Sequence, residues 1–89
     1  MNQNPSDIAA RRRRVLYRAT HRGTFECDLL LGRFAAAWVG TFDEAALTAF
    51  EALLDCPDAD LLDWISGRAE PPPPYRTPVL EALRKFYAS

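Results

Sequence analysis

Residues 22–31 read RGTFECDLLL and separate two segments in which apolar residues recur at helical spacing. Gly23 follows the arginine-rich upstream segment, and glycine is the residue that best adopts the left-handed backbone closing a helix. Downstream, the leucines and Phe34 resume a period of three to four residues, which predicts a second helix. Glu26 then falls in its first turn, near the positive end of the helix dipole. The stretch predicts a corner between two helices that crowds a cation and two carboxylates around a glycine.

The rest of the chain keeps the helical period and shows no strand-like alternation. We therefore predict an all-α fold, a small five-helix bundle. The first helix is expected at about 7–21 and the second at about 25–39. A third ends near 54, a fourth runs from 57 or 58 to Gly67, and a fifth spans about 78–87. The expected helix-end residues are Ser6, Gly23, Gly40, Thr41 with Glu44 as a capping box, Pro57, Gly67, and Thr77 with Pro78.

Apolar residues predict which side of each helix faces the interior. For the second helix the spacing favours an inward stripe of Phe25, Leu29, Leu30, Phe34 and either Ala37 or Trp38. For the third helix it favours Leu47, Phe50, Leu53 and Leu54, and for the fifth Val79, Leu80, Leu83 and Phe86.

The length of 89 residues predicts one domain. Its ordered core is expected at about 7–70, followed by the tetraproline linker 71–74 and the C-terminal helix at about 78–87. Proline rings stiffen that linker, and we expect it to return the last helix across the bundle.

Composition excludes several classes of protein. No apolar run approaches the roughly 18–20 residues that cross a bilayer, and residues 1–7 lack the apolar region of a secretory signal. Cys27 and Cys56 are 29 residues apart, and His21 is the only histidine in the sequence. These are too few ligands for a zinc site, so we expect free thiols and no metal. Nucleophile-elbow, phosphate-loop and C-x-x-C patterns are all absent. An autonomous enzyme is therefore not expected.

Charge is segregated along the chain although the net charge is −1. Residues 11–33 hold seven arginines against Glu26 and Asp28, whereas residues 41–70 hold eight acids against Arg68. This polarity is typical of a molecule that orients a charged partner. The basic helix could also bind nucleic acid, but a pI of 5.7 argues against that.

Two interpretations of the corner at residues 22–28 remain open on these grounds. It can be a plain helix–helix turn in which Gly23 caps one helix and the acids complement the dipole of the next. It can instead be a protein-docking site, in which Arg14, Arg18 and Arg22 offer bidentate hydrogen bonds to a partner. In the second case Gly23 leaves room for the partner's backbone.

Three motifs in register connect the chain to a known family. They are Arg22-Gly23-x-x-Glu26-x-Asp28 with its leucine run, FEALL at 50–54, and Asp58-x-Asp60-Leu61-x-x-Trp64 before Gly67. From Arg12 to Trp64 the chain resembles the SdhE family of bacteria, known in mitochondria as succinate dehydrogenase assembly factor 2. The chain departs from the family pattern at His21, at Cys27 and in the tetraproline.

The resemblance implies a function. Members of that family bind the flavoprotein subunit of succinate dehydrogenase, and in some bacteria that of fumarate reductase. They promote covalent attachment of FAD to a histidine of that client. The resemblance places the functional surface on Arg22, Gly23 and Glu26, with Asp28 as the following acid.

The same resemblance sets expectations about cofactor and location. It implies a protein that holds no cofactor stably, acts on the FAD of its client, and is a monomer when free. Neither nucleic acid nor membrane insertion is expected, and the predicted location is the bacterial cytoplasm. The alternative interpretation is a basic-faced helical binding module for another protein or for nucleic acid.

Overall fold

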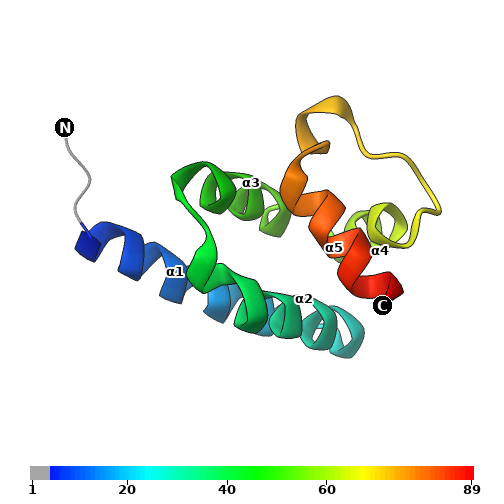
Figure 1. Cartoon of the computed structure of the whole chain (residues 1–89). Coiled ribbons are helices and arrows are strands. Elements are labelled where there is room, and N and C mark those ends of the chain that lie inside the picture. Colours follow the sequence, from blue (N-terminus) through cyan, green and yellow to red (C-terminus); the bar gives the residue numbers. More distant parts are fainter. Residues whose placement is uncertain (1–4) are drawn as a thin grey trace.

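A computed structural model describes residues 5–89, and within that range it is all-α with no strand (Figure 1). The polar residues 1–4, on which the absence of a secretory signal partly depends, lie outside the described residues. Within it are the helices α1 (Pro5–Thr20), α2 (Phe25–Trp38), α3 (Glu44–Leu54), α4 (Asp58–Ser66) and α5 (Pro78–Ala88). Two 3₁₀ turns, η1 (Val39–Thr41) and η2 (Pro73–Tyr75), complete the order. The prediction of a five-helix all-α fold is confirmed.

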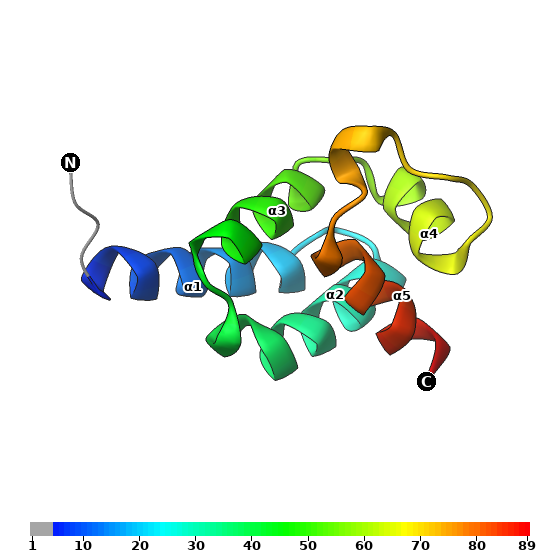
Figure 2. The same cartoon turned by 45° about the horizontal axis from the view of Figure 1, so that its top comes forward.

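Helices α1, α2 and α3 form one group and α4 and α5 form another, and contacts of α5 with α3 and α2 connect the two groups. Helices α1 and α2 lie side by side and run in opposite directions, joined by the corner at residues 21–24 (Figures 1 and 2). Helix α3 packs against α1, and α5 contacts α4, α3 and α2. Helix α5 therefore returns across the bundle, as the sequence predicts, and its C-terminal end lies near the beginning of α2 (Figure 2). None of the helices in residues 5–89 has both the length and the hydropathy that a bilayer crossing requires.

A cluster of aromatic rings occupies the middle of the core. The Phe34 ring from α2 lies with its centroid 5.8 Å from that of Phe50 and 5.6 Å from that of Phe86. Phe42 completes the cluster at 6.1 Å from Phe34. Tilted and edge-on rings at such distances are favoured by the aromatic quadrupole. This cluster joins α2, α3 and α5, so the end of α5 is anchored beside α2.

The predicted inward stripe of α2 is wrong for most of its residues. Phe25 is 81% exposed and Trp38 is 48% exposed, and of the predicted set only Phe34 is fully buried. The buried side of α2 consists of Cys27, Leu31, Gly32, Phe34 and Ala35. At Gly32 an added Cβ would lie 2.8 Å from the Thr20 methyl group, so the missing side chain is what allows α1 to approach closely. Small residues carry this interface, and they weigh little in a count of apolar spacing.

Several predicted helix ends are confirmed, whereas those at Ser6, Gly40 and Thr41 are wrong. Gly67 ends α4 with a φ of +82°, and Thr77 caps α5 ahead of Pro78. Helix α1 begins at Pro5, so Ser6 lies inside it, and α2 continues into η1 instead of ending at Gly40. The capping box is also wrong: Asp43, not Thr41, accepts the N–H of Ala46, at 2.9 Å. A carboxylate directly before the helix can accept that N–H, whereas η1 occupies Thr41.

The proline segment is more structured than a plain spacer. Pro71 is buried, and the turn at Pro73–Tyr75 brings Tyr75 onto Trp64 with ring centroids 5.1 Å apart. Arg76 donates from Nε to the Pro71 carbonyl at 3.0 Å. The segment is therefore held against α4 on its way to α5.

We expect Asp43→Ala to lower the free energy of unfolding by about 1 kcal/mol, because it removes the side-chain cap of α3. Thr41→Ala is the matched control, since the Thr41 hydroxyl donates only to the Trp38 carbonyl outside α3. Thermal denaturation followed by circular dichroism measures both. Equal destabilisation by the two variants would contradict the assignment of the cap to Asp43.

Candidate docking site at the Gly23 corner

The corner between α1 and α2 is built on one glycine and one carboxylate. Gly23 has a φ of +102°, a backbone conformation that residues with a Cβ rarely adopt. Helix α1 ends at Thr20, so Gly23 lies within the corner, not at the end of the helix. Asp28 accepts the backbone N–H of Arg22 at 2.5 Å and that of Gly23 at 3.3 Å. The first turn of α2 thus fixes the backbone of Arg22 and Gly23 in the preceding corner.

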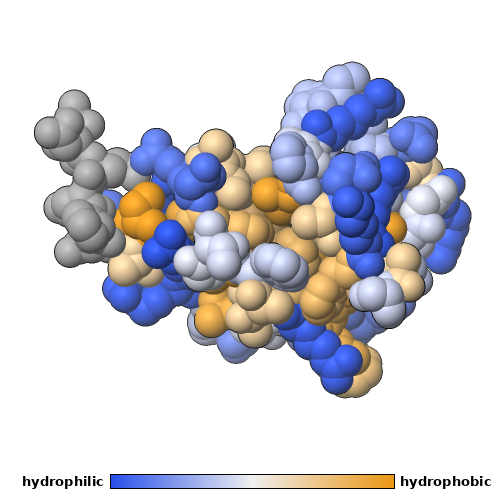
Figure 3. Space-filling view, in the orientation of Figure 1, coloured by the Kyte–Doolittle hydropathy of each residue, from blue (hydrophilic) through white to orange (hydrophobic). Residues whose placement is uncertain are grey.

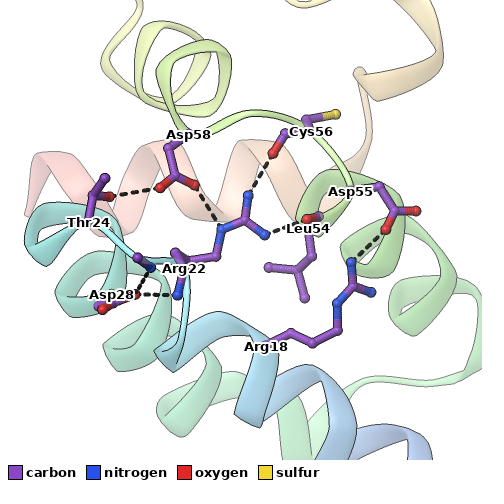
Figure 4. Close-up of polar contacts among 9 residues, drawn as sticks. Arg18, Arg22, Thr24, Asp28, Leu54, Asp55, Cys56 and Asp58 are labelled. Atoms are coloured by element: carbon purple, nitrogen blue, oxygen red, sulfur yellow. Dashed lines mark hydrogen bonds and ion pairs between the residues drawn. The ribbon is translucent and has the colours of Figure 1, made fainter.

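Arg22 points into the molecule, where its side chain is only 11% exposed (Figure 4). Its Nε donates to Asp58 at 2.8 Å, its Nη2 to the Cys56 carbonyl at 2.6 Å, and its Nη1 to the Leu54 carbonyl. Leu54 is the last residue of α3 and Asp58 the first of α4. One guanidinium therefore caps the end of α3 and pairs with the beginning of α4.

Asp58 is held in its charged form by this arrangement. Burial alone would raise the pKa of its carboxyl group, but hydrogen bonds from Thr24 and Arg22, together with the Arg22 charge, outweigh burial and lower the pKa. The Thr24 hydroxyl donates to Asp58 at 2.8 Å. The stabilisation is present above the ordinary unfolded-state pKa of about 3.9 and is lost as pH falls through the lower folded-state pKa. At neutral pH the pair is complete.

Most of the predicted basic face is used inside the molecule. Arg11 pairs with Glu51 at 2.8 Å, Arg18 with Asp55 at 2.5 Å, and Arg22 with Asp58. Three arginines of the first segment thus meet one acid in α3, one directly after it and one at the start of α4, so the segregated charges attract each other across the fold. Arg12 donates to the Phe42 carbonyl, and Arg14 is exposed. Arg13, Arg14 and Arg33 remain exposed, so the pairing reduces the basic surface that is open to phosphates without removing it.

The outward side of the corner is formed by different residues. Glu26 is exposed, and its carboxylate has no hydrogen-bond or ion-pair partner among residues 5–89. Nothing lies within 4 Å of a Cβ placed on Gly23, so the surface there is open. Phe25, between them, is 81% exposed. The predicted residues are brought together, but Arg22 and Asp28 face inward while Gly23 and Glu26 face outward.

Two features of the corner escape prediction from the sequence. Asp58 belongs to the site although it is 36 residues away from Arg22, and no local pattern connects the two residues. His21, for which the sequence offers no role, stacks on Tyr17 with centroids 3.8 Å apart. Its Nδ1 lies 2.8 Å from the Tyr17 carbonyl, which only accepts, so His21 donates there and closes the end of α1.

The thiols offer no second site. Cys27 and Cys56 are free and buried, and burial raises the pKa of the Cys27 thiol. Over the range 5–89, acidic, histidine and cysteine side chains form no group of three that could hold a metal ion.

The comparisons with known proteins agree with the three motifs. A family model described as "Flavinator of succinate dehydrogenase" matches residues 13–87. The chain belongs to that family. It is 46% identical over 77 residues to the FAD assembly factor SdhE of Acetobacter pasteurianus, a match that covers 86% of this chain and 71% of the relative.

Relatives in eukaryotes are named succinate dehydrogenase assembly factor 2, mitochondrial. The Dictyostelium discoideum relative is 37% identical over 84 residues, covering 94% of this chain and 60% of its own length. The Cryptococcus neoformans relative is 35% identical over 86 residues, covering 96% and 49%. The chain thus spans about half to 60% of these two relatives. All three relatives are named as assembly factors and not as catalysts, in agreement with the prediction that the chain is not an enzyme.

We expect Arg22→Lys to lower the free energy of unfolding by about 2 kcal/mol or more, because a lysine cannot reach Asp58 and two carbonyls at once. Arg14→Lys is the matched control, since Arg14 is exposed and makes none of these contacts. Urea denaturation of both variants measures the difference. A loss below about 0.5 kcal/mol for Arg22→Lys, the ordinary range for surface substitutions, would contradict the inward role.

Proposed function

We propose that this protein binds the flavoprotein subunit of succinate dehydrogenase and promotes covalent attachment of FAD to it. The observation that carries the proposal is the match of residues 13–87 to the family of succinate dehydrogenase flavinators. The Gly23 corner supports it, because it presents an open backbone and an unpaired carboxylate on a rigid frame. Such a frame favours docking since little conformational freedom is lost on binding.

In this proposal some residues of the corner hold its backbone in place and others contact the client. Arg22 and Asp28 fix the backbone from inside, so in this proposal they act through the residues that they position. Glu26 contacts the client, and Gly23 allows the client's backbone to approach. Arg18 and Arg14 flank the corner on α1: Arg18 is 40% exposed beside Asp55, and Arg14 is fully available to a partner acid.

The assistance is positional. FAD and the acceptor histidine belong to the client, and the chain holds no cofactor of its own in this proposal. Docking of a rigid helical unit shifts the client toward the conformation in which the flavin and the acceptor histidine are aligned. The energetic limit is the difference in affinity of the chain for the aligned and unaligned conformations.

The remaining features of the proposal follow from the family. The flavoprotein subunit of fumarate reductase is a second client in this proposal. The chain is a monomer when free. It works in the bacterial cytoplasm, where its client is made.

We expect Gly23→Arg to abolish covalent flavin on the client, because a long side chain would project from the open surface at the corner. Gly23→Ala is the matched control: it carries the same strain of about 1–2 kcal/mol from a positive φ, but nothing lies near its Cβ. In-gel flavin fluorescence of the denatured flavoprotein subunit, from cells lacking this protein and complemented with each variant, measures the outcome.

Full covalent flavin with Gly23→Arg would overturn the docking role of the corner. An unchanged flavin band on deletion of the protein would overturn the proposed function as a whole. If Gly23→Ala fails as completely as Gly23→Arg, thermal denaturation of the purified Gly23→Ala variant decides between the causes: an unfolded variant assigns the loss to backbone strain, and a folded one assigns it to access at the corner.

A further inference from the structure

A second feature continues from the corner along α2. A groove of about 270 Å³ lies between α2 and the last turn of α5. Its lining residues include Glu26, Leu29, Leu30, Arg33, Phe86 and Tyr87. Glu26 thus belongs both to the Gly23 corner and to this groove. The groove and the corner form one continuous surface.

The groove exposes apolar side chains that the fold leaves uncovered. Leu29 is 39% exposed and Tyr87 is 46% exposed, although Phe86 beside them is anchored in the aromatic core. Phe25 lies one helical turn before Leu29 and is 81% exposed. Figure 3 shows apolar residues gathered over the middle of the face that carries α2 and α5, bordered by strongly hydrophilic residues. Contiguous apolar surface with a polar border is typical of a docking site.

Opposite charges lie at the two ends of the groove. Glu26 and Arg33 are seven residues apart on α2, which places them about two turns or 10 Å apart along the helix. Both are exposed, and in the described part of the chain neither side chain has a hydrogen-bond or ion-pair partner. A partner that fits must therefore offer a cation, an apolar centre and an acid in that order.

We infer that the client-docking surface extends from the Gly23 corner into this groove, which takes an amphipathic segment of the client flavoprotein. The apolar side of that segment lies between Leu29 on α2 and Tyr87 on α5, with its cation at Glu26 and its acid at Arg33. The inference rests on the proposed function and deepens it. It means that α5 also contacts the client. Glu26 then lies where the two parts of the interface, the corner and the groove, meet.

The test measures the affinity of the purified full-length chain for the purified succinate dehydrogenase flavoprotein subunit by calorimetry. We expect Leu29→Ala and Tyr87→Ala to weaken binding about tenfold each, as central apolar contacts do. Arg33→Glu is expected to weaken it by a similar factor because it repels the client's acid. Thermal denaturation should show little change, since all three side chains lie partly or fully at the surface.

Matched controls come from α1. Leu16 is 36% exposed and lies outside the groove, so Leu16→Ala matches Leu29→Ala. Arg13 is exposed and matches Arg33 in charge, so Arg13→Glu controls for the change in net charge. Both controls are expected to bind within about twofold of the unchanged chain.

The outcomes separate this inference from the function on which it rests. If Glu26→Ala weakens binding while the Leu29, Tyr87 and Arg33 variants bind normally, the groove is not part of the interface but the proposed function stands. If the three groove variants abolish self-association and leave client binding intact, the groove takes a second copy and the inference is wrong. If the unchanged chain does not bind the flavoprotein at all, both the function and the inference fail.

Discussion

The structure depends on the contacts of one guanidinium. Arg22 caps the last carbonyl of α3, donates to the Cys56 carbonyl between α3 and α4, pairs with Asp58 at the start of α4, and lies at the corner before α2. The start of α2 is thus joined at this one side chain to the junction of α3 and α4, more than 30 residues further along the chain. Because the side chain is largely removed from water, loss of the Asp58 carboxylate would leave the guanidinium charge buried without an opposite charge beside it. We therefore expect the corner to be as rigid as the bundle itself.

This internal contact explains why the outward residues can serve recognition. Glu26 contributes nothing to the packing, and Gly23 has open space around it, so both are free to meet a partner. The same division appears in the charges. Arginines at 11, 18 and 22 attract acids at 51, 55 and 58, and this interhelix pairing leaves only part of the basic segment for other molecules. The segregation of positive and negative charge along the sequence therefore serves the packing of the helices first.

The sequence predicts where helices begin and end better than it predicts which side chains point into the core. Helical period, Gly67, and Thr77 with Pro78 placed helices correctly because they act within one or two turns. The prediction of the buried side of α2 is wrong, because Gly32 and Ala35 determine that side by letting α1 approach closely. Small residues contribute little to a pattern of apolar spacing. Arg22 was expected outside; its inward position depends on Leu54, Cys56 and Asp58, more than 30 residues away. No local signal reports such a contact, whereas the motif pattern did bring Arg22 and Asp58 into one family resemblance.

The most direct test of this account is the backbone mobility of residues 22–26, measured by ¹⁵N relaxation in the unchanged chain and in Arg22→Lys. A corner held by the Arg22 guanidinium predicts order parameters near 0.85 in the unchanged chain, as in rigid backbone. In Arg22→Lys they should fall below about 0.6 at the corner while α3 and α5 stay rigid. A corner that is equally rigid in both proteins, or already mobile in the unchanged chain, would contradict the claim that Arg22 holds the docking surface in place.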